Sequence, residues 1–412
     1  MTGRLILWGW LLGAILWASP GFGAEGDPVA ALKEYLGQPW ESRAPLAEQP
    51  MAKAPLTSAQ ANQAGKLLSL DYRKHLQATR RQELAEKKIV VDEWSMPLEY
   101  FVYGKKPKNG YSLWISMHGG GQTAKEVNDG QWENQKQLYR PKEGIYVAPR
   151  APTDSWNMWH QAHIDVLFTR LIEDMIALAD VDPNRIYIMG YSAGGDGVYQ
   201  LAPRMSDQLA GAAMMAGHPN ETQAIGLRNI PFYLQVGGKD NGFERNKKAQ
   251  EFGDELDRLK KEDPQGYKHE VKIYPQYGHW MNREDQIALP WLARLSRVKY
   301  PPRIVWRQDD VTHDRFYWLG VDKAEAEGGQ VIIARQDDGK IVFDQLPTEL
   351  SKVRLLLSDD MLPLDKPVHV ELPGGKKLEV EPTRTIATLA ETLWQRGDPE
   401  SMAAAEVIIP LN

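Results

Sequence analysis

The residues best suited to chemistry in this sequence surround Ser192. The stretch Arg185–Gly195 reads R-I-Y-I-M-G-Y-S-A-G-G, a short apolar run followed by a G-x-S-x-G pattern. A buried strand that runs into glycines around one serine is typical of a nucleophile elbow, whose sharp turn exposes the serine hydroxyl. The glycines relieve the crowding in so tight a turn. We therefore predict that Ser192 is a nucleophile, that the N–H of Ala193 points to the same spot, and that Tyr191 contacts the substrate.

A serine hydroxyl needs a base to take its proton, because it is a weak nucleophile near neutral pH. His279, in Y-G-H-W, follows the last strand of the predicted sheet. Asp240 follows the strand before it, in G-G-K-D-N-G, and Glu221 is the reserve candidate for the acid. Loops at the carboxyl ends of parallel strands converge on one crevice. The order of the three residues along the chain therefore predicts that Asp240 orients His279, and that His279 activates Ser192.

The oxyanion that develops on the substrate also needs hydrogen-bond donors. His118-Gly119-Gly120-Gly121 directly follows a predicted strand, about seventy residues before the serine. Glycines allow the backbone to approach a substrate carbonyl closely. We expect the N–H of Gly120 to share the oxyanion with that of Ala193.

These motifs, H-G-G-G, G-Y-S-A-G-G, K-D-N-G and Y-G-H-W in this order, resemble the α/β-hydrolase superfamily. The resemblance is greatest to its polyhydroxybutyrate-depolymerase-like, feruloyl-esterase-like and dienelactone-hydrolase-like esterases, and it covers about residues 93–295. It implies the roles given above for the serine, aspartate, histidine and oxyanion donors. It also implies a carboxylic-ester hydrolase that forms an acyl-enzyme and needs no cofactor.

A second group of residues is expected at the mouth of the crevice. An aromatic segment follows a predicted strand, and two further positions follow the strands near the triad. As substrate-binding residues we predict Trp156, Trp159, His160, His218 and Trp280. The tryptophans would stack on an aromatic or sugar-like group, although core packing of this segment is an equal alternative. His160, His163 and Asp165 have a spacing that suits a metal, but nothing completes the site, so we predict no metal.

Alternating strands and helices position these residues and predict a doubly wound, mostly parallel α/β sheet. The expected strands are 88–103, 111–117, 144–149, 186–189, 211–216, 230–236 and 269–274. The expected helices are 162–179, 196–205, 242–260 and 284–297, with a long loop between 121 and 144. Short alternating runs after Tyr300-Pro301-Pro302, with one helix near 386–395, predict a small β-sandwich.

The first residues read as a secretory signal peptide over residues 1–23, with Arg4, an apolar segment and small residues before the cleavage point. An uncleaved anchor is the alternative, although the apolar run is shorter than the ~20 residues that span a bilayer. We expect an arm and a long helix over 24–87, a catalytic domain over 88–300 and a β-rich accessory domain over 301–412. The long helix is predicted to pack on the core or to form a lid.

Composition limits the remaining possibilities. The 412 residues carry a formal charge of -6 without a basic stripe, so we expect no nucleic-acid partner and no membrane contact after cleavage. The chain has no cysteine, which excludes disulfides and a thiolate nucleophile. We predict a periplasmic or secreted esterase whose substrate is a polymeric or aromatic ester. Two alternatives stay open: a serine peptidase of the prolyl-oligopeptidase type, and a protein that binds a polymer or partner through its C-terminal β-region.

Overall fold

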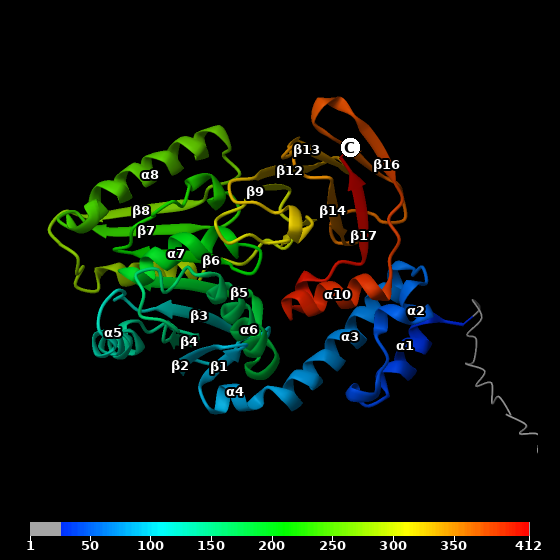
Figure 1. Ribbon diagram of the computed structural model, residues 1–412, viewed down its shortest axis with the longest axis horizontal. Helices are drawn as coiled ribbons and strands as arrows, with labels where there is room; N and C mark the ends of the chain where they lie inside the picture. The colour runs from blue at the N-terminus through cyan, green and yellow to red at the C-terminus, as the bar shows by residue number, and fades with distance from the viewer. Residues whose placement is uncertain (1–25, 412) are drawn as a thin grey trace, which may run out of the picture.

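The computed structural model describes residues 26–411, so the predicted signal peptide lies outside the described residues. Figure 1 shows three parts. A large sheet with its helices occupies one side, a β-rich region made by the end of the chain lies beside it, and the first helices run beneath the two. The helices of the first part of the chain are α1 Pro28–Leu36, α2 Pro50–Lys53, α3 Ser58–Thr79 and α4 Arg81–Ala85.

The large sheet has eight strands in the order β1-β2-β4-β3-β5-β6-β7-β8. β1 and β2 pair antiparallel, β2 pairs antiparallel with β4, and the strands from β4 to β8 are parallel. The strand bounds are β1 Lys88–Val91, β2 Trp94–Tyr103, β3 Tyr111–Met117, β4 Gly144–Pro149, β5 Val181–Tyr191, β6 Gly211–Met215, β7 Phe232–Gly237 and β8 His269–Tyr274. The predicted mostly parallel α/β sheet is confirmed, with a hairpin in place of the single strand expected over 88–103.

Helices cover both faces of this sheet because side chains of each strand alternate between the faces. Ile115 and Ile188 lie in one core with the inner sides of α6, α7 and α8, whereas Trp114 and Tyr187 lie in a second core with α9 and the end of α5. The helix bounds are α5 Lys125–Leu138, α6 Ala162–Ala179, α7 Ala193–Arg204, α8 Arg245–Glu262 and α9 Ala288–Leu292. The central strands β3 to β7 are therefore mostly buried on both faces, whereas β2 and β8, toward the two edges of the sheet, are partly exposed.

Two predictions about this part were wrong. The segment expected to be a long loop contains the fourteen-residue helix α5, of which only Asn128 and Gln135 are buried. Its inward face is polar, so the apolar spacing that marks a helix is missing. The helix expected over 284–297 is reduced to a 3-10 turn, Glu284–Ile287, and the short α9.

The end of the chain forms two separate sheets, as the prediction of a β-rich region requires. One sheet has the order β10-β11-β14-β17 and the other β16-β15-β13-β12-β9. The elements are β9 Arg303–Arg307, β10 Arg315–Phe316, β11 Leu319–Gly320, β12 Val331–Asp337, β13 Lys340–Gln345, β14 Lys352–Leu357, β15 Val368–Glu371, β16 Lys377–Val380, α10 Ile386–Arg396 and β17 Ala405–Pro410.

The first helices share a core with this C-terminal region. Leu32 and Leu68 are buried in the same apolar cluster as Trp318, Leu355 and Leu389. In Figure 1, α3 runs alongside α10 and continues beneath α6. The long helix therefore does not form the lid that was one of its two predicted roles, and it ends at Thr79, earlier than expected.

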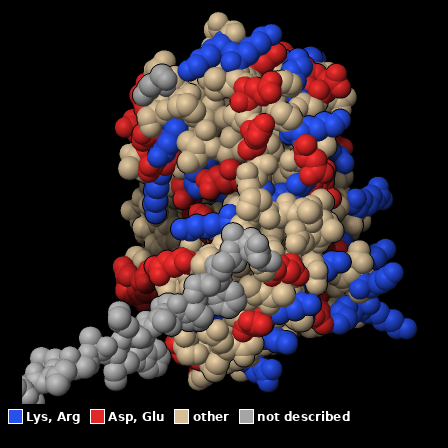
Figure 2. Space-filling model, turned by 90° about the vertical axis from the view of Figure 1, so that its right-hand side faces the viewer, with Lys and Arg blue, Asp and Glu red and all other residues tan. Residues whose placement is uncertain are grey.

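The surface carries both charges. Figure 2 shows Lys and Arg intermixed with Asp and Glu over the face that includes the first helices and the C-terminal region. Within residues 26–411 no helix is long and apolar enough to span a bilayer.

The core shared by α3 and the C-terminal region predicts unequal effects of two leucines on the same helix. Leu68 is 3% exposed and Leu70 is 54% exposed. Leu68→Ala removes buried methyl groups and leaves a cavity, so we expect the free energy of unfolding to fall by about 2–5 kcal/mol. Leu70→Ala should change it by less than about 0.5 kcal/mol. Urea titration followed by circular dichroism measures both, and equal losses would contradict the shared core.

Candidate functional site

Ser192 stands at the junction of β5 and α7 in a strained conformation. Its φ of 58° and ψ of -122° are rarely adopted by a residue with a side chain. The turn closes so tightly that a Cβ on Gly190 would lie 2.1 Å from the carbonyl oxygen of Gly194. Only glycine fits at that position. The G-x-S-x-G pattern therefore encodes a geometry in which the serine hydroxyl faces out of the sheet.

The structure brings the three residues predicted as a triad together. His279 Nε2 lies 3.0 Å from Ser192 Oγ, and His279 Nδ1 lies 2.7 Å from Asp240 Oδ2. Asp240 is buried, whereas the imidazole side chain is 44% exposed. The two hydrogen bonds form one line from a buried carboxylate through the imidazole to the hydroxyl. Such an arrangement can take the serine proton and stabilise the charge that the imidazole acquires.

The reserve acid has other partners. Glu221 accepts a hydrogen bond of 2.9 Å from Gln200 Nε2 and lies beside Asp309 and Asp310. Asp240 alone among the predicted acids contacts the histidine.

Tyr191 has a contact that the sequence did not suggest. Its hydroxyl donates to the carbonyl oxygen of His279 at 2.7 Å and accepts from the N–H of Met281 at 2.9 Å. Burial raises the pKa of this phenol well above its usual value, so the hydroxyl keeps its proton. Tyr191 lines the cavity as predicted, and it also clamps the loop that carries His279.

The His118–Gly121 loop lies against the serine. Gly119 and Gly120 line the same cavity as Ser192 and His279. Gly120 has a φ of 115°, and a Cβ there would lie 2.1 Å from Asn128 Oδ1. That oxygen accepts the N–H of Gly121 at 2.8 Å, so α5 holds the loop in place. Ala193 is the first residue of α7, immediately after the serine.

The cavity in front of the serine has a volume of about 750 Å³. Trp280 is half exposed and lies in its wall beside Tyr191, with ring centroids 5.5 Å apart. Another part of the wall is α5, a helix that was not predicted from the sequence. Its contributions include Gln131, Asn134 and Gln137. Arg283, also missed, lines the cavity and donates to the carbonyl oxygen of Leu138 at 2.7 Å.

Four predicted substrate contacts do not line this cavity. Trp159 is fully buried, and its Nε1 donates to the carbonyl oxygen of His118 at 2.8 Å. His160 is also buried, so the core alternative holds for these two residues. Trp156 is exposed but packs edge-on against His160. The prediction failed because position along a loop does not determine which way a side chain points.

His218 is the fourth of these residues. The ring Nδ1 of His218 contacts Asn220, and the backbone N–H of His218 donates to Asp196 Oδ1 at 2.6 Å. Burial raises the pKa of Asp196 to about 6. His218 therefore belongs to the support of α7 and not to the cavity.

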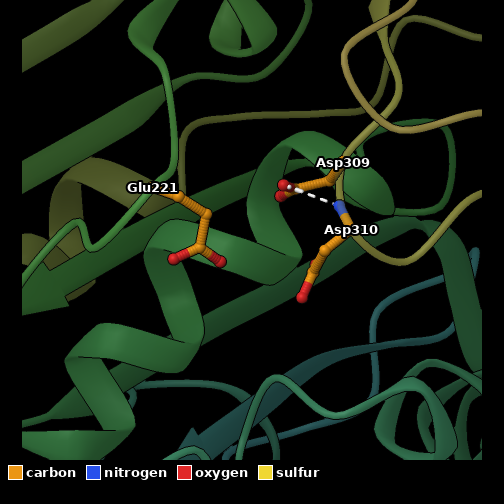
Figure 3. A group of neighbouring side chains, drawn as sticks. All are labelled: Glu221, Asp309 and Asp310. Atoms are coloured by element: carbon orange, nitrogen blue, oxygen red, sulfur yellow. Dashed lines mark hydrogen bonds between the residues drawn. The ribbon is translucent and has the colours of Figure 1, made fainter.

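The residues considered for a metal are engaged elsewhere. His163 stacks on Trp94 with ring centroids 3.7 Å apart, and Asp165 pairs with Arg204 and His313. Within residues 26–411, one group of three acids has the closeness of metal ligands, and Figure 3 shows it: Glu221, Asp309 and Asp310. The positive guanidinium of Arg204 offsets the negative charge of this group, because it lies 2.7 Å from Asp310 and 3.5 Å from Asp309.

His118 yields a prediction about pH. Its Nε2 accepts the N–H of Ala151 at 3.2 Å, so Nδ1 carries the proton and donates to the carbonyl oxygen of Gly119. Burial lowers its pKa from 6.5 to about 4. The unfolded chain takes up this proton below pH 6.5 and the folded chain does not, so stability is complete above pH 6.5 and falls toward pH 4.

His118→Gln removes this titration. We expect the acid loss of unfolding free energy between pH 6.5 and 4 to shrink by about 3 kcal/mol, because one pKa unit corresponds to ~1.36 kcal/mol. Urea titrations at stepped pH measure this slope. A slope unchanged by the substitution would contradict a buried neutral imidazole.

Comparison with known proteins agrees with the motifs. Residues 137–306 match the model of the dienelactone hydrolase family. No curated protein matches the chain. Solved structures with a similar fold include a thermostable esterase, which is 20% identical with a TM-score of 0.40 over 51% of this chain and 62% of that one. A ferulic acid esterase is 15% identical with a TM-score of 0.39 over 50% of this chain and 96% of that one. An S-formylglutathione hydrolase from Agrobacterium tumefaciens is 13% identical with a TM-score of 0.38 over 49% of this chain and 90% of that one.

The chain spans 62% of the length of the thermostable esterase. The eight-stranded, mostly parallel sheet and the family match over residues 137–306 agree with the resemblance that the sequence motifs indicate.

Proposed function

We propose that this protein is an exported serine esterase that forms an acyl-enzyme on Ser192. The observation that carries the proposal is the line of hydrogen bonds from Asp240 through His279 to Ser192 Oγ. The family match supports the ester as the substrate class. The signal-peptide pattern of residues 1–23 supports export to the periplasm or the medium.

The reaction begins when Ser192 Oγ attacks the ester carbonyl carbon while His279 Nε2 takes the hydroxyl proton. The negative oxygen of the tetrahedral intermediate accepts hydrogen bonds from the N–H groups of Ala193 and Gly120. His279 then donates its proton to the leaving alcohol oxygen as the carbon–oxygen bond breaks. A water molecule repeats the sequence on the acyl-enzyme and releases the carboxylic acid. Asp240 keeps the imidazole in the required tautomer throughout.

The walls of the cavity favour a substrate with a ring and several polar groups. Amide side chains both donate and accept hydrogen bonds, so Gln131, Asn134 and Gln137 suit a hydroxyl-bearing group. Trp280 offers an aromatic face on the other side. We propose that the ester bears a sugar-like or hydroxylated aromatic group. This substrate would be part of a polymer or a fragment of one.

The triad is tested with a serine variant and with two matched carboxylate variants, Asp240→Asn and Glu221→Gln. Ser192→Ala should lower kcat on p-nitrophenyl esters at least about a thousandfold, because no nucleophile remains. Asp240→Asn should cause a loss of similar size, because the imidazole is left in the wrong tautomer. Glu221→Gln, which removes the reserve acid, should leave kcat within about twofold of the original.

A fluorophosphonate probe that labels the protein but not Ser192→Ala adds a readout independent of the substrate. Undiminished turnover by Ser192→Ala would overturn the assignment. Faster cleavage of arylamides than of the matching esters would favour a peptidase instead.

The aromatic wall is tested on substrates with and without a ring. Trp280→Ala should raise KM for an acetylated sugar by roughly threefold to tenfold, because stacking contributes about 0.5–1.5 kcal/mol. KM for ethyl acetate should stay the same, and Trp280→Phe should recover part of the loss. An equal rise in KM for both substrates would show that Trp280 shapes the loop and does not contact the ring.

A further inference from the structure

Trp159 also supports the loop His118–Gly121, which carries the predicted oxyanion donor Gly120. The indole Nε1 donates to the carbonyl oxygen of His118 at 2.8 Å. The same side chain packs on α7, where a Cβ on Gly197 would lie 2.5 Å from Trp159 Cβ. Trp159 therefore fills the space between the helix that carries the nucleophile and the loop that carries the oxyanion donors. A shift of its ring would move the two relative to each other.

The next residue along the chain is held by a buried arginine. Arg204, at the end of α7, donates from Nη1 to the carbonyl oxygen of His160 at 3.0 Å. Its side chain is 2% exposed, so its charge needs partners in the interior. One partner is Asp165 on α6, at 3.3 Å. Gln200 Oε1 accepts a further bond from Nη2 at 3.2 Å.

The remaining partners belong to the C-terminal region. Asp310 Oδ1 accepts from Arg204 Nη2 at 2.7 Å, and Asp309 Oδ2 lies 3.5 Å from Nε. Asp309 is buried, whereas the side chain of Asp310 is 59% exposed. Figure 3 shows these two carboxylates on the loop that enters beside α7, with the N–H of Asp310 bonded to Asp309 Oδ1. A region outside the large sheet thus reaches the support of the site.

We propose that Arg204 is a positioning residue through which the C-terminal region holds the oxyanion loop in its working geometry. Asp309 and Asp310 fix the guanidinium, the guanidinium fixes the carbonyl of His160, and Trp159 then supports His118 from below. This inference rests on the proposed esterase function for its effect on rate. It gives the C-terminal region a role in positioning the site.

Small displacements of oxyanion donors reduce kcat more than KM, because those donors bind the transition state more strongly than the substrate. Asp309→Asn and Asp310→Asn should therefore lower kcat on p-nitrophenyl acetate by about threefold to thirtyfold, the range seen when residues distant from a site alter it. KM should change by less than about twofold. Asp310, which is 59% exposed, is the variant least able to disturb folding.

Asp398→Asn is the matched control. Asp398 is buried, as Asp309 is, and it also pairs a C-terminal carboxylate with an arginine that follows the large sheet, Arg297, at 2.6 Å. It does not contact Arg204. We expect Asp398→Asn to lower Tm while kcat at 25 °C stays within about twofold of the original. Equal losses of kcat in Asp398→Asn and Asp310→Asn would overturn the proposal, because any loosening of the two regions would then suffice.

Hydrogen exchange gives a readout that does not depend on esterase activity. Amides of the peptide that contains residues 118–124 should exchange faster in Asp310→Asn than in the original protein, and at the original rate in Asp398→Asn. Unchanged exchange together with unchanged kcat in Asp310→Asn would also overturn the proposal. If Ser192→Ala retains full turnover, the esterase assignment fails, and the exchange experiment still decides whether Arg204 positions this loop.

Discussion

The strained backbone at Ser192 is the constraint on which the rest of the site depends. A residue other than glycine in such a conformation costs about 1–3 kcal/mol, so it persists only where the surroundings leave no alternative. Here β5 is held between β3 and β6, and the N–H of Ser192 donates to the carbonyl oxygen of Met215 at 2.9 Å. Close backbone contacts at the neighbouring glycines complete the restraint. The backbone of Ser192 is therefore held in place before any substrate arrives.

The remaining groups of the site lie on loops, and each loop is fixed to a rigid element. Tyr191, the residue before the serine, holds the loop of His279 through two hydrogen bonds. Asn128 on α5 holds the glycine loop, and Trp159 supports it from beneath. Preorganised donors need little rearrangement as charge develops, which is the principal way in which such sites accelerate acyl transfer. The inward face of α5 is polar because Asn128 pairs with the backbone of that loop and Gln135 donates to Ser116 Oγ on β3.

The sequence predicted best those features that depend on backbone geometry at strand ends. Ser192, Asp240 and His279 each follow a strand of β-formers, and parallel strands bring such positions together whatever lies between them. Features that depend on side-chain direction were predicted poorly. Trp159 and Trp156 are three residues apart, yet one is buried and the other exposed. α5 escaped detection because its two buried residues, Asn128 and Gln135, are polar and are held by hydrogen bonds, so the apolar spacing of a helix is missing. The burial of Asp309 depends on an arginine more than a hundred residues away.

Ion pairs and hydrogen bonds join the C-terminal region to the domain of the large sheet, while it shares an apolar core with the first helices. Arg204, Arg297 and Arg396 each pair with a carboxylate across that junction. Buried ion pairs contribute little net stability, because desolvation offsets their attraction, but they disfavour any arrangement that leaves a charge unpaired. An apolar junction would tolerate sliding, since apolar contacts are not directional. The charged junction therefore sets the orientation of the region, and the apolar core supplies its cohesion. The loop that carries Asp309 and Asp310 requires such a fixed orientation, because it must hold the side chain of Arg204 within hydrogen-bond distance.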